Sequence, residues 1–303
     1  MRTRALLFVA VALIASIVAA PAGASQLIDR NATNVSLKID ADGVALLSYK
    51  IAGITKNVVA RGAVNAIAPT TARPQVKFEL DYSGGYKFFR KSDFPKVFEG
   101  TCGKYDGPDL EWLIAACKAP DGSYWAAQSW QRQLPNVGLT PKPEQAVWEL
   151  RLSHWKDELP VFTINLDWAY RRFEHLYGSL TYLGKAVHGF RSTSTGEPLD
   201  TFGRNIYLDT FDSAYGKGWG RENSFLAHRP NGNFCYGFYP NQNNSGRPPG
   251  NGTRYRATVI GPGVTPDMYW EGVSRGPYNR ELDLVANEDQ LEFSPADRLC
   301  RPN

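Results

Sequence analysis

The chain has 303 residues, of which 43% are apolar and 13% aromatic, and it carries 34 basic and 30 acidic side chains. This composition is typical of a globular protein and excludes an intrinsically disordered one. The formal net charge of +4 is too small to indicate a nucleic-acid or anionic-membrane partner, because such partners require a concentrated basic face. We therefore expect a globular protein with no nucleic-acid partner.

The first 24 residues have the pattern of a secretory signal peptide. Arg2 and Arg4 form a short basic region, and residues 5–20 are an unbroken apolar and small run that precedes a predicted cut after Ala24. This run of 16 residues is shorter than the roughly 20 residues of a membrane-spanning helix, so cleavage is favoured over a retained anchor. We expect a secreted chain with no membrane span after cleavage and a net charge of +2 (32 basic minus 30 acidic side chains).

The cysteines indicate a protein stabilised by disulfides. All four lie beyond the predicted signal peptide, and an even number in an exported chain favours two bonds. Four cysteines allow three pairings. We favour Cys102 with Cys117, which flank one turn-rich segment, and Cys235 with Cys300, which ties down the tail. No CxxC or CxxH spacing supports a zinc site, so we predict neither a metal nor another cofactor.

From residue 25 onward, short alternating runs separated by turn residues predict β-strands. The first three runs, residues 35–39, 44–51 and 54–60, form a β-meander. Residues 86–107 have no regular pattern and are expected to form a long loop. A short helix over residues 108–116 is the alternative to one of the later strands. The further predicted strands span residues 75–82, 110–118, 124–132, 146–155, 161–170, 173–182, 186–190, 205–211, 224–228, 234–239 and 254–260.

Residues 135–144, with three prolines and one glycine, are the best candidate for a domain boundary. We accordingly predict an N-terminal β-domain over residues 25–140 and a C-terminal β-domain over residues 141–303, with a single large β-domain as the alternative. No long segment has helical periodicity, and the tail after residue 260 is irregular. The pattern therefore predicts an all-β protein with few helices, built as an antiparallel β-sandwich or a jelly-roll-like fold.

The strand predicted at residues 146–155 separates two kinds of side chain. Alternation places Glu149 and Arg151 on one face, and Leu152 and His154 on the other. Because His154 shares its face with apolar neighbours, we interpret it as a hydrogen-bonded interior histidine rather than a catalytic one.

No complete catalytic motif is present, since the sequence lacks GxSxG, HExxH, the phosphate-binding GxxxxGK(S/T) and GxGxxG. Two facing carboxyl groups could still hydrolyse a glycosidic bond, and we favour Asp209 and Asp212 because they end a strand where loops gather. His188 and His228, each at a strand–loop junction, are the candidate general bases. Other carboxylates on or beside predicted strands are Glu149, Asp167 and Glu222.

Residues 182–239 combine glycine-rich polar loops with aromatic side chains, a composition that suits saccharide binding. Aromatic rings stack on the apolar faces of sugars, while Asn, Asp and Arg bond their hydroxyl groups. The plainer interpretation is that these aromatic side chains cover the end of a sandwich. The candidate ligand-binding residues are Arg204, Asn205, Tyr207, Tyr215 and Trp219.

These patterns favour a binding protein over an enzyme. We expect an extracellular or envelope-associated protein whose partner is a polysaccharide or a cell-surface component, bound by the loops between residues 191 and 229. One alternative is a secreted, glycosidase-like hydrolase that uses carboxylates or histidines of residues 188–229. The other is a structural envelope protein without a small ligand.

Overall fold

The structure, a computed structural model, describes residues 25–64, 67, 70, 72, 78–133, 146–169, 173–189, 205–213, 216–238 and 252–293. Within these residues the chain forms sixteen β-strands and three helices, and the strands pair into four antiparallel sheets of four strands each. The predicted all-β class with few helices is therefore confirmed. No helix in the described ranges combines the length and apolarity that a membrane crossing requires.

The first two sheets form an N-terminal sandwich. Their facing sides enclose an apolar core in which Tyr49, Trp125 and Leu150 are almost completely buried. Alternation produces this core, because every second side chain of a strand points to the same face. Sheet 1 consists, in spatial order, of β2 (Thr33–Ile39), β3 (Ala45–Ile51), β4 (Ile54–Arg61) and β5 (Glu79–Asp81). Sheet 2 consists of β1 (Gln26–Arg30), β8 (Ala146–Trp155), β7 (Tyr124–Gln133) and β6 (Leu113–Lys118).

Residues 86–107, which we expected to form a loop, contain two short helices, α1 (Tyr86–Phe89) and α2 (Phe94–Val97). Their aromatic side chains pack against the outer face of sheet 1, and the rings of Phe89 and Phe94 stack with their centroids 4.4 Å apart. Each helix has only four residues, which is too short to produce a helical period in the sequence. The helix considered over residues 108–116 does not form, because its C-terminal part belongs to β6.

The other two sheets form a C-terminal sandwich. Leu176, Leu208 and Phe234 are completely buried in its apolar core. Sheet 3 consists, in spatial order, of β13 (Gly216–Leu226), β12 (Asn205–Ser213), β15 (Arg254–Val259) and β16 (Met268–Val273). Sheet 4 consists of β10 (Phe173–Tyr182) and its partners β9 (Val161–Ala169), β14 (Asn233–Phe238) and β11 (Lys185–Ala186).

The predicted disulfide between Cys102 and Cys117 is present, with 5.7 Å between the two Cα atoms. It ties the segment after α2 to β6. Cys235, on β14, is disulfide-bonded as well, and its predicted partner Cys300 lies outside the described residues.

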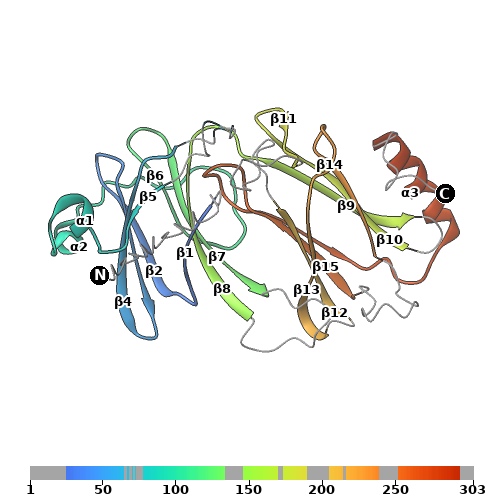
Figure 1. The fold of residues 1–303 in the computed structure, drawn as a ribbon, viewed down its shortest axis with the longest axis horizontal. Coiled ribbons are helices and arrows are strands. Elements are labelled where there is room, and N and C mark those ends of the chain that lie inside the picture. Colours follow the sequence, from blue (N-terminus) through green and yellow to red (C-terminus); the bar gives the residue numbers. More distant parts are fainter. Residues whose placement is uncertain are drawn as a thin grey trace, which may run out of the picture.

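Figure 1 shows the four sheets as successive layers. Sheet 1 lies next to α1 and α2 at one end, sheets 2 and 3 meet in the middle, and sheet 4 lies next to α3 (Arg280–Phe293) at the other end. The tail after residue 260 was expected to be irregular, so β16 and α3 are both corrections. Asn279 precedes this helix, and its side-chain oxygen accepts hydrogen bonds from the backbone N–H groups of Glu281 and Leu282. Such a cap satisfies donors that a helix start leaves unpaired.

Strand pairing groups β8 with the N-terminal half of the chain. It pairs with β7 along its whole length and with β1 on its other side, so the division predicted at residue 140 falls between two neighbouring strands of one sheet. The chain also returns to this half later. The connection between β15 and β16 inserts Val264 into the N-terminal core, where its carbonyl oxygen accepts a hydrogen bond from the backbone N–H of His154 at 2.9 Å.

Sheets 2 and 3 meet through charged side chains. Asp209 on β12 is fully buried and accepts hydrogen bonds from two guanidinium groups, those of Arg221 and Arg256. Arg256 Nη2 also donates to the carbonyl oxygen of Gln131 on β7 at 3.3 Å. The cluster around Asp209 therefore links the two sandwiches.

A second charged cluster is buried at the same interface. Asp267, at the end of the β15–β16 connection, accepts hydrogen bonds from Trp130 Nε1 at 2.9 Å and from the hydroxyl of Ser25. Arg151 Nε lies 3.6 Å from the carboxylate of Asp267, and Arg151 Nη2 bonds Glu149 at 2.6 Å. Burial alone would lower the pKa of Arg151, but these two carboxylates raise it, so the guanidinium stays charged.

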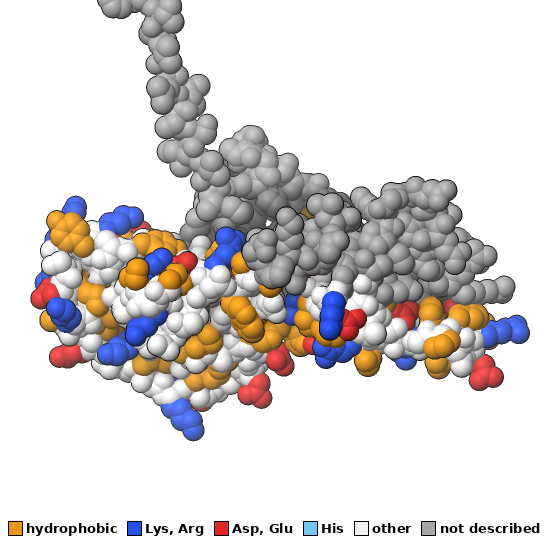
Figure 2. All heavy atoms as spheres, turned by 90° about the horizontal axis from the view of Figure 1, so that it is seen from below, with side chains coloured by type: hydrophobic (Ala, Val, Ile, Leu, Met, Phe, Trp, Pro, Cys, Tyr) orange, Lys and Arg blue, Asp and Glu red, His pale blue; other side chains and the backbone are white. Residues whose placement is uncertain are grey.

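We refer to the two clusters together as the buried charge layer, which comprises Glu149, Arg151, Asp209, Arg221, Arg256 and Asp267. On the outer face that Figure 2 shows, acidic, basic and apolar side chains are instead interspersed. Charges inside a protein are tolerated when each has a partner of opposite sign and its hydrogen bonds are made. The ion pairs of Asp209, Glu149 and Asp267 give each charge of the layer a partner of opposite sign, although Arg221 Nη2 makes no hydrogen bond to any described residue.

His154 is buried in the N-terminal sandwich, as its position among apolar residues predicted. Its Nε2 lies 2.9 Å from Ser123 Oγ, and its Nδ1 lies 3.0 Å from the carbonyl oxygen of Gly62. The indole ring of Trp125 stacks on the imidazole with 3.9 Å between ring centroids. Burial lowers the pKa of His154 to about 4 from its usual 6.5.

This lowered pKa predicts a stability that depends on pH. The unfolded chain binds a proton below pH 6.5, whereas the folded chain resists it until about pH 4. The stabilisation is therefore complete above pH 6.5 and is lost as the pH falls through that window, by about 3 kcal/mol in total. Urea unfolding at a series of pH values measures this loss. In His154→Gln we expect a flatter pH dependence over the same window, and equal slopes in the two proteins would contradict the assignment.

Candidate functional site

Asp209, our favoured catalytic carboxylate, lies in the buried charge layer. Its side chain is 0% exposed, and both of its oxygens are held by arginines. A carboxylate in this position cannot reach a ligand in solvent. Its part in the structure is to neutralise the two guanidinium groups that sheets 2 and 3 bury between them.

Two aromatic candidates, Tyr207 and Trp219, lie on the same face of sheet 3 as Asp209. The guanidinium of Arg221 lies 4.8 Å from the ring centroid of Tyr207, and that of Arg256 lies 4.7 Å from the ring of Trp219. Both rings are only partly exposed. Their faces are thus occupied by cations of the chain itself, an arrangement that stabilises charge in a partly desolvated position.

The remaining predicted residues are distributed around the edges of sheet 3. Asp212 has a left-handed φ of 50° at a bulge of β12, and its carboxylate accepts a hydrogen bond from the backbone N–H of Gly218 at 2.7 Å. Asn205 is exposed at the start of β12. A backbone hydrogen bond from Gly189 to Ala227 at 3.0 Å brings the segments of His188 and His228 together. Arg204 and Tyr215 lie outside the described residues.

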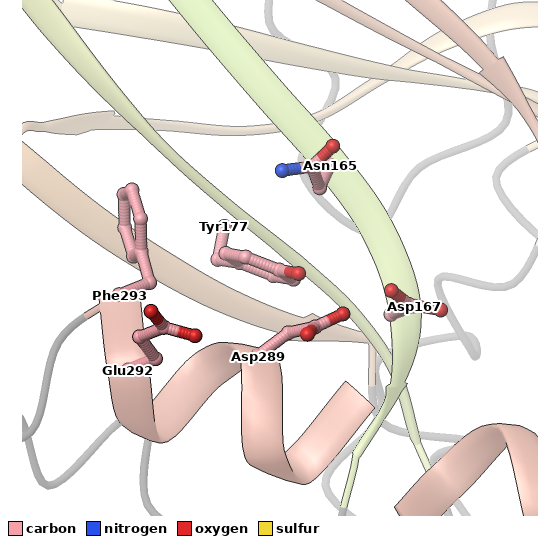
Figure 3. Close-up of a pocket in the computed structure, with 6 residues that line it drawn as sticks. All are labelled: Asn165, Asp167, Tyr177, Asp289, Glu292 and Phe293. Carbon is pink, nitrogen blue, oxygen red and sulfur yellow. The ribbon is translucent and has the colours of Figure 1, made fainter. Parts of the chain in front are cut away.

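A hollow lies elsewhere, between the outer face of sheet 4 and α3, with a volume of about 330 Å³. Asn165 and Asp167 alternate onto this face of β9, and Tyr177 on β10 is the direct cross-strand partner of Asn165. The last turn of α3 closes the other side (Figure 3). The lining residues are Asn165, Asp167, Tyr177, Asp289, Glu292 and Phe293.

The packing of the fold explains the ring of Tyr177 but gives its hydroxyl no partner among the described residues. The residue is 3% exposed, and its ring packs against that of Phe293 with 5.4 Å between centroids. Figure 3 shows this hydroxyl pointing toward the carboxylates of Asp289 and Asp167. Burial and these two carboxylates raise the pKa of Tyr177 to about 12, so the group keeps its proton and can donate it.

The three carboxylates of the hollow differ in their partners. Asp167 is paired with Arg275 Nη2 at 3.1 Å, and its side chain is 18% exposed. Burial raises the pKa of Asp167; Arg275 opposes this shift and Asp289 adds to it. Asp289 and Glu292 are exposed and form no ion pair with any residue that the structure describes. The hollow therefore holds negative charge that the surrounding side chains do not neutralise.

These groups suit reversible hydrogen bonding to a polar ligand. Tyr177 and Asn165 can donate, the carboxylates accept, and the Phe293 ring offers an apolar surface. Within the described ranges, no group of three or more His, Cys, Asp or Glu side chains is arranged to hold a metal ion. Comparison with models of protein families, with curated proteins and with solved structures finds no match to this chain.

Of the residues that line the hollow, only Asp167 was a candidate from its sequence pattern. The others were missed because three of them lie on α3, which was not predicted. The signal was present, since Asn279 is followed by Glu281 and Asp283 and by no glycine or proline up to residue 293. An N-cap followed by acidic residues in the first turn is typical of a helix start.

We predict that Tyr177→Phe does not destabilise the protein. The Tyr177 hydroxyl faces the hollow and bonds no described residue, so its removal costs no hydrogen bond within the protein and is expected to change the free energy of unfolding by less than about 1 kcal/mol. The matched control is Tyr236→Phe on β14, because the Tyr236 hydroxyl donates to Glu222 at 3.3 Å and accepts from Asn223. Denaturant unfolding of the two variants tests this difference. An equal loss of stability in both would show that the Tyr177 hydroxyl is bonded in solution.

Proposed function

We propose that the protein is an exported binding protein that holds a saccharide unit of an extracellular polysaccharide in the hollow beneath α3. The signal-peptide pattern of residues 1–24 supports export. The Cys102–Cys117 disulfide supports it too, because such bonds persist in oxidising compartments.

The unpartnered hydroxyl of Tyr177 is the observation that carries the proposal. The ring of Tyr177 is buried, but its hydroxyl opens into the hollow and bonds no described residue (Figure 3), so it is available to a ligand hydroxyl there. Saccharides present many groups that both donate and accept. The carboxylate of Asp289 lies beside the Tyr177 hydroxyl, and the amide of Asn165 lines the same hollow, so both can bond such groups (Figure 3).

The size and remaining wall of the hollow agree with a ligand of this kind. Its volume of about 330 Å³ is at the lower end of small-molecule sites, which span roughly 300–1,000 Å³. The Phe293 ring supplies the apolar surface on which a sugar ring can lie.

The proposal keeps the ligand class expected from the sequence and changes the site. Tyr207 and Trp219 already contact arginines of the chain, so they are less suited to a ligand than the hollow. A hydrolase would need carboxyl groups that reach the glycosidic bond. Asp209 is buried between two guanidinium groups, and no contact of Asp212 beyond its turn favours that role.

A glycan array followed by titration calorimetry on the oxidised protein tests this function. We expect a saccharide to bind and Asn165→Ala to weaken that binding by about tenfold, through the loss of one or two hydrogen bonds. Thr163→Ala is the matched control, because Thr163 is exposed on the same face of β9 and does not line the hollow. The proposal fails if no glycan binds, or if the two variants bind as tightly as the wild type.

A further inference from the structure

Helix α3 carries an unusual distribution of charge. It has five acidic residues and one basic residue, a difference of four negative charges, and its last turn contains no basic residue. The C-terminal end of a helix has a partial negative charge, so cations are stabilised there and carboxylates are not. Yet Asp289 and Glu292 lie in this part of α3, where both line the hollow. The helix end and these side chains therefore add negative potential at the same place.

The nearest cation does not neutralise this potential. Arg275 reaches the edge of the hollow, where Nη2 pairs with Asp167. Two other groups of Arg275 bond residues outside the hollow. Its Nε donates to the carbonyl oxygen of Leu166 at 2.7 Å, and its backbone N–H donates to Glu174 at 2.7 Å. Asp289 and Glu292 are left for a cation that the described chain does not provide.

Resting on the saccharide-binding function above, we propose that the hollow selects a saccharide with a free, protonated amino group, that is, a hexosamine unit that is not acetylated. The ammonium group is bound by Asp289 and Glu292 at the C-terminal end of α3. The hydroxyl groups of the same sugar ring are bonded by Tyr177 and Asn165. A charge-assisted hydrogen bond is about twice as strong as a neutral one, so the amine is the main determinant of specificity.

The uncharged polar residues that line the hollow, Tyr177 and Asn165, favour an amino sugar over a lysine-rich peptide. A lysine side chain brings three donors on one nitrogen and no acceptor. It would satisfy the carboxylates and leave the hydroxyl of Tyr177, which points into the hollow (Figure 3), without an acceptor other than those carboxylates. A hexosamine brings the cation together with hydroxyl oxygens that can accept from Tyr177.

Titration calorimetry of the full oxidised protein at about pH 6, where amines of this kind are protonated, tests the inference. Three probes are compared: glucosamine oligomers, N-acetylglucosamine oligomers of the same length, and oligolysine of the same charge. We expect acetylation to weaken binding by about tenfold or more. Asp289→Asn should weaken the binding of the free-amine oligomer by a similar factor, whereas Glu288→Gln should not. Glu288 is the matched control because it is exposed on the same helix and does not line the hollow.

Each other outcome overturns the inference in a recognisable way. Equal binding of acetylated and free-amine oligomers would reject selection for the amine and leave saccharide binding in place. Binding of oligolysine without either sugar would identify a cationic peptide as the ligand and reject both proposals. Absence of binding by all three probes would reject the inference, and the glycan array would then decide separately on saccharide binding. Equal losses in Asp289→Asn and Glu288→Gln would point to a general charge effect outside the hollow.

Discussion

The contact on which this architecture depends is the carboxylate of Asp209 held between Arg221 and Arg256. Each sandwich has its own apolar core, and the surface that joins them is the buried charge layer. Removing one partner of a buried ion pair costs about 3–5 kcal/mol, because a charge is then left uncompensated. Sheets 2 and 3 therefore stay together in one register, since a shift of either sheet would separate these charges.

The β15–β16 connection also joins the two sandwiches, because it reaches from the C-terminal sandwich into the N-terminal one. It leaves the C-terminal sandwich, places Val264 in the N-terminal core and ends at Asp267, which bonds Trp130 and Ser25. The β-layers thus form a continuous support that ends at sheet 4. The hollow lies on the outer face of this last layer, and a site formed by strands and a helix is held more precisely than one formed by loops.

Alternation and turn residues were sufficient to predict most of the strands and the all-β class, because both depend on local chemistry, but β1, β16 and the first part of β13 were not predicted. Whether a polar face of a strand meets solvent or packs against another sheet was not predictable in this way. Glu149 and Arg151 alternate with apolar residues as solvated side chains do, yet they are buried against another sheet. Helix α3 was not predicted because its apolar residues do not mark the face that packs against the sheet. Its polar Gln290 is buried and bonded to His175 at 2.6 Å, whereas its apolar Leu284 is 54% exposed.

Charged side chains in this protein thus have two roles, which differ in their partners. In the buried charge layer, carboxylates and guanidinium groups neutralise one another and join the two sandwiches. In the hollow, Asp289 and Glu292 have no counterion among the described residues, and the adjacent hydroxyl of Tyr177 bonds none of these residues. The charges of the first arrangement are paired within the protein, and we propose that a ligand pairs those of the second.

Differential scanning calorimetry of the oxidised wild-type protein tests most directly whether the buried charge layer makes the two sandwiches a single body. We predict one unfolding transition in which the calorimetric and van't Hoff enthalpies agree. Two resolved transitions, or a calorimetric enthalpy about twice the van't Hoff value, would show that the sandwiches unfold independently and would contradict it.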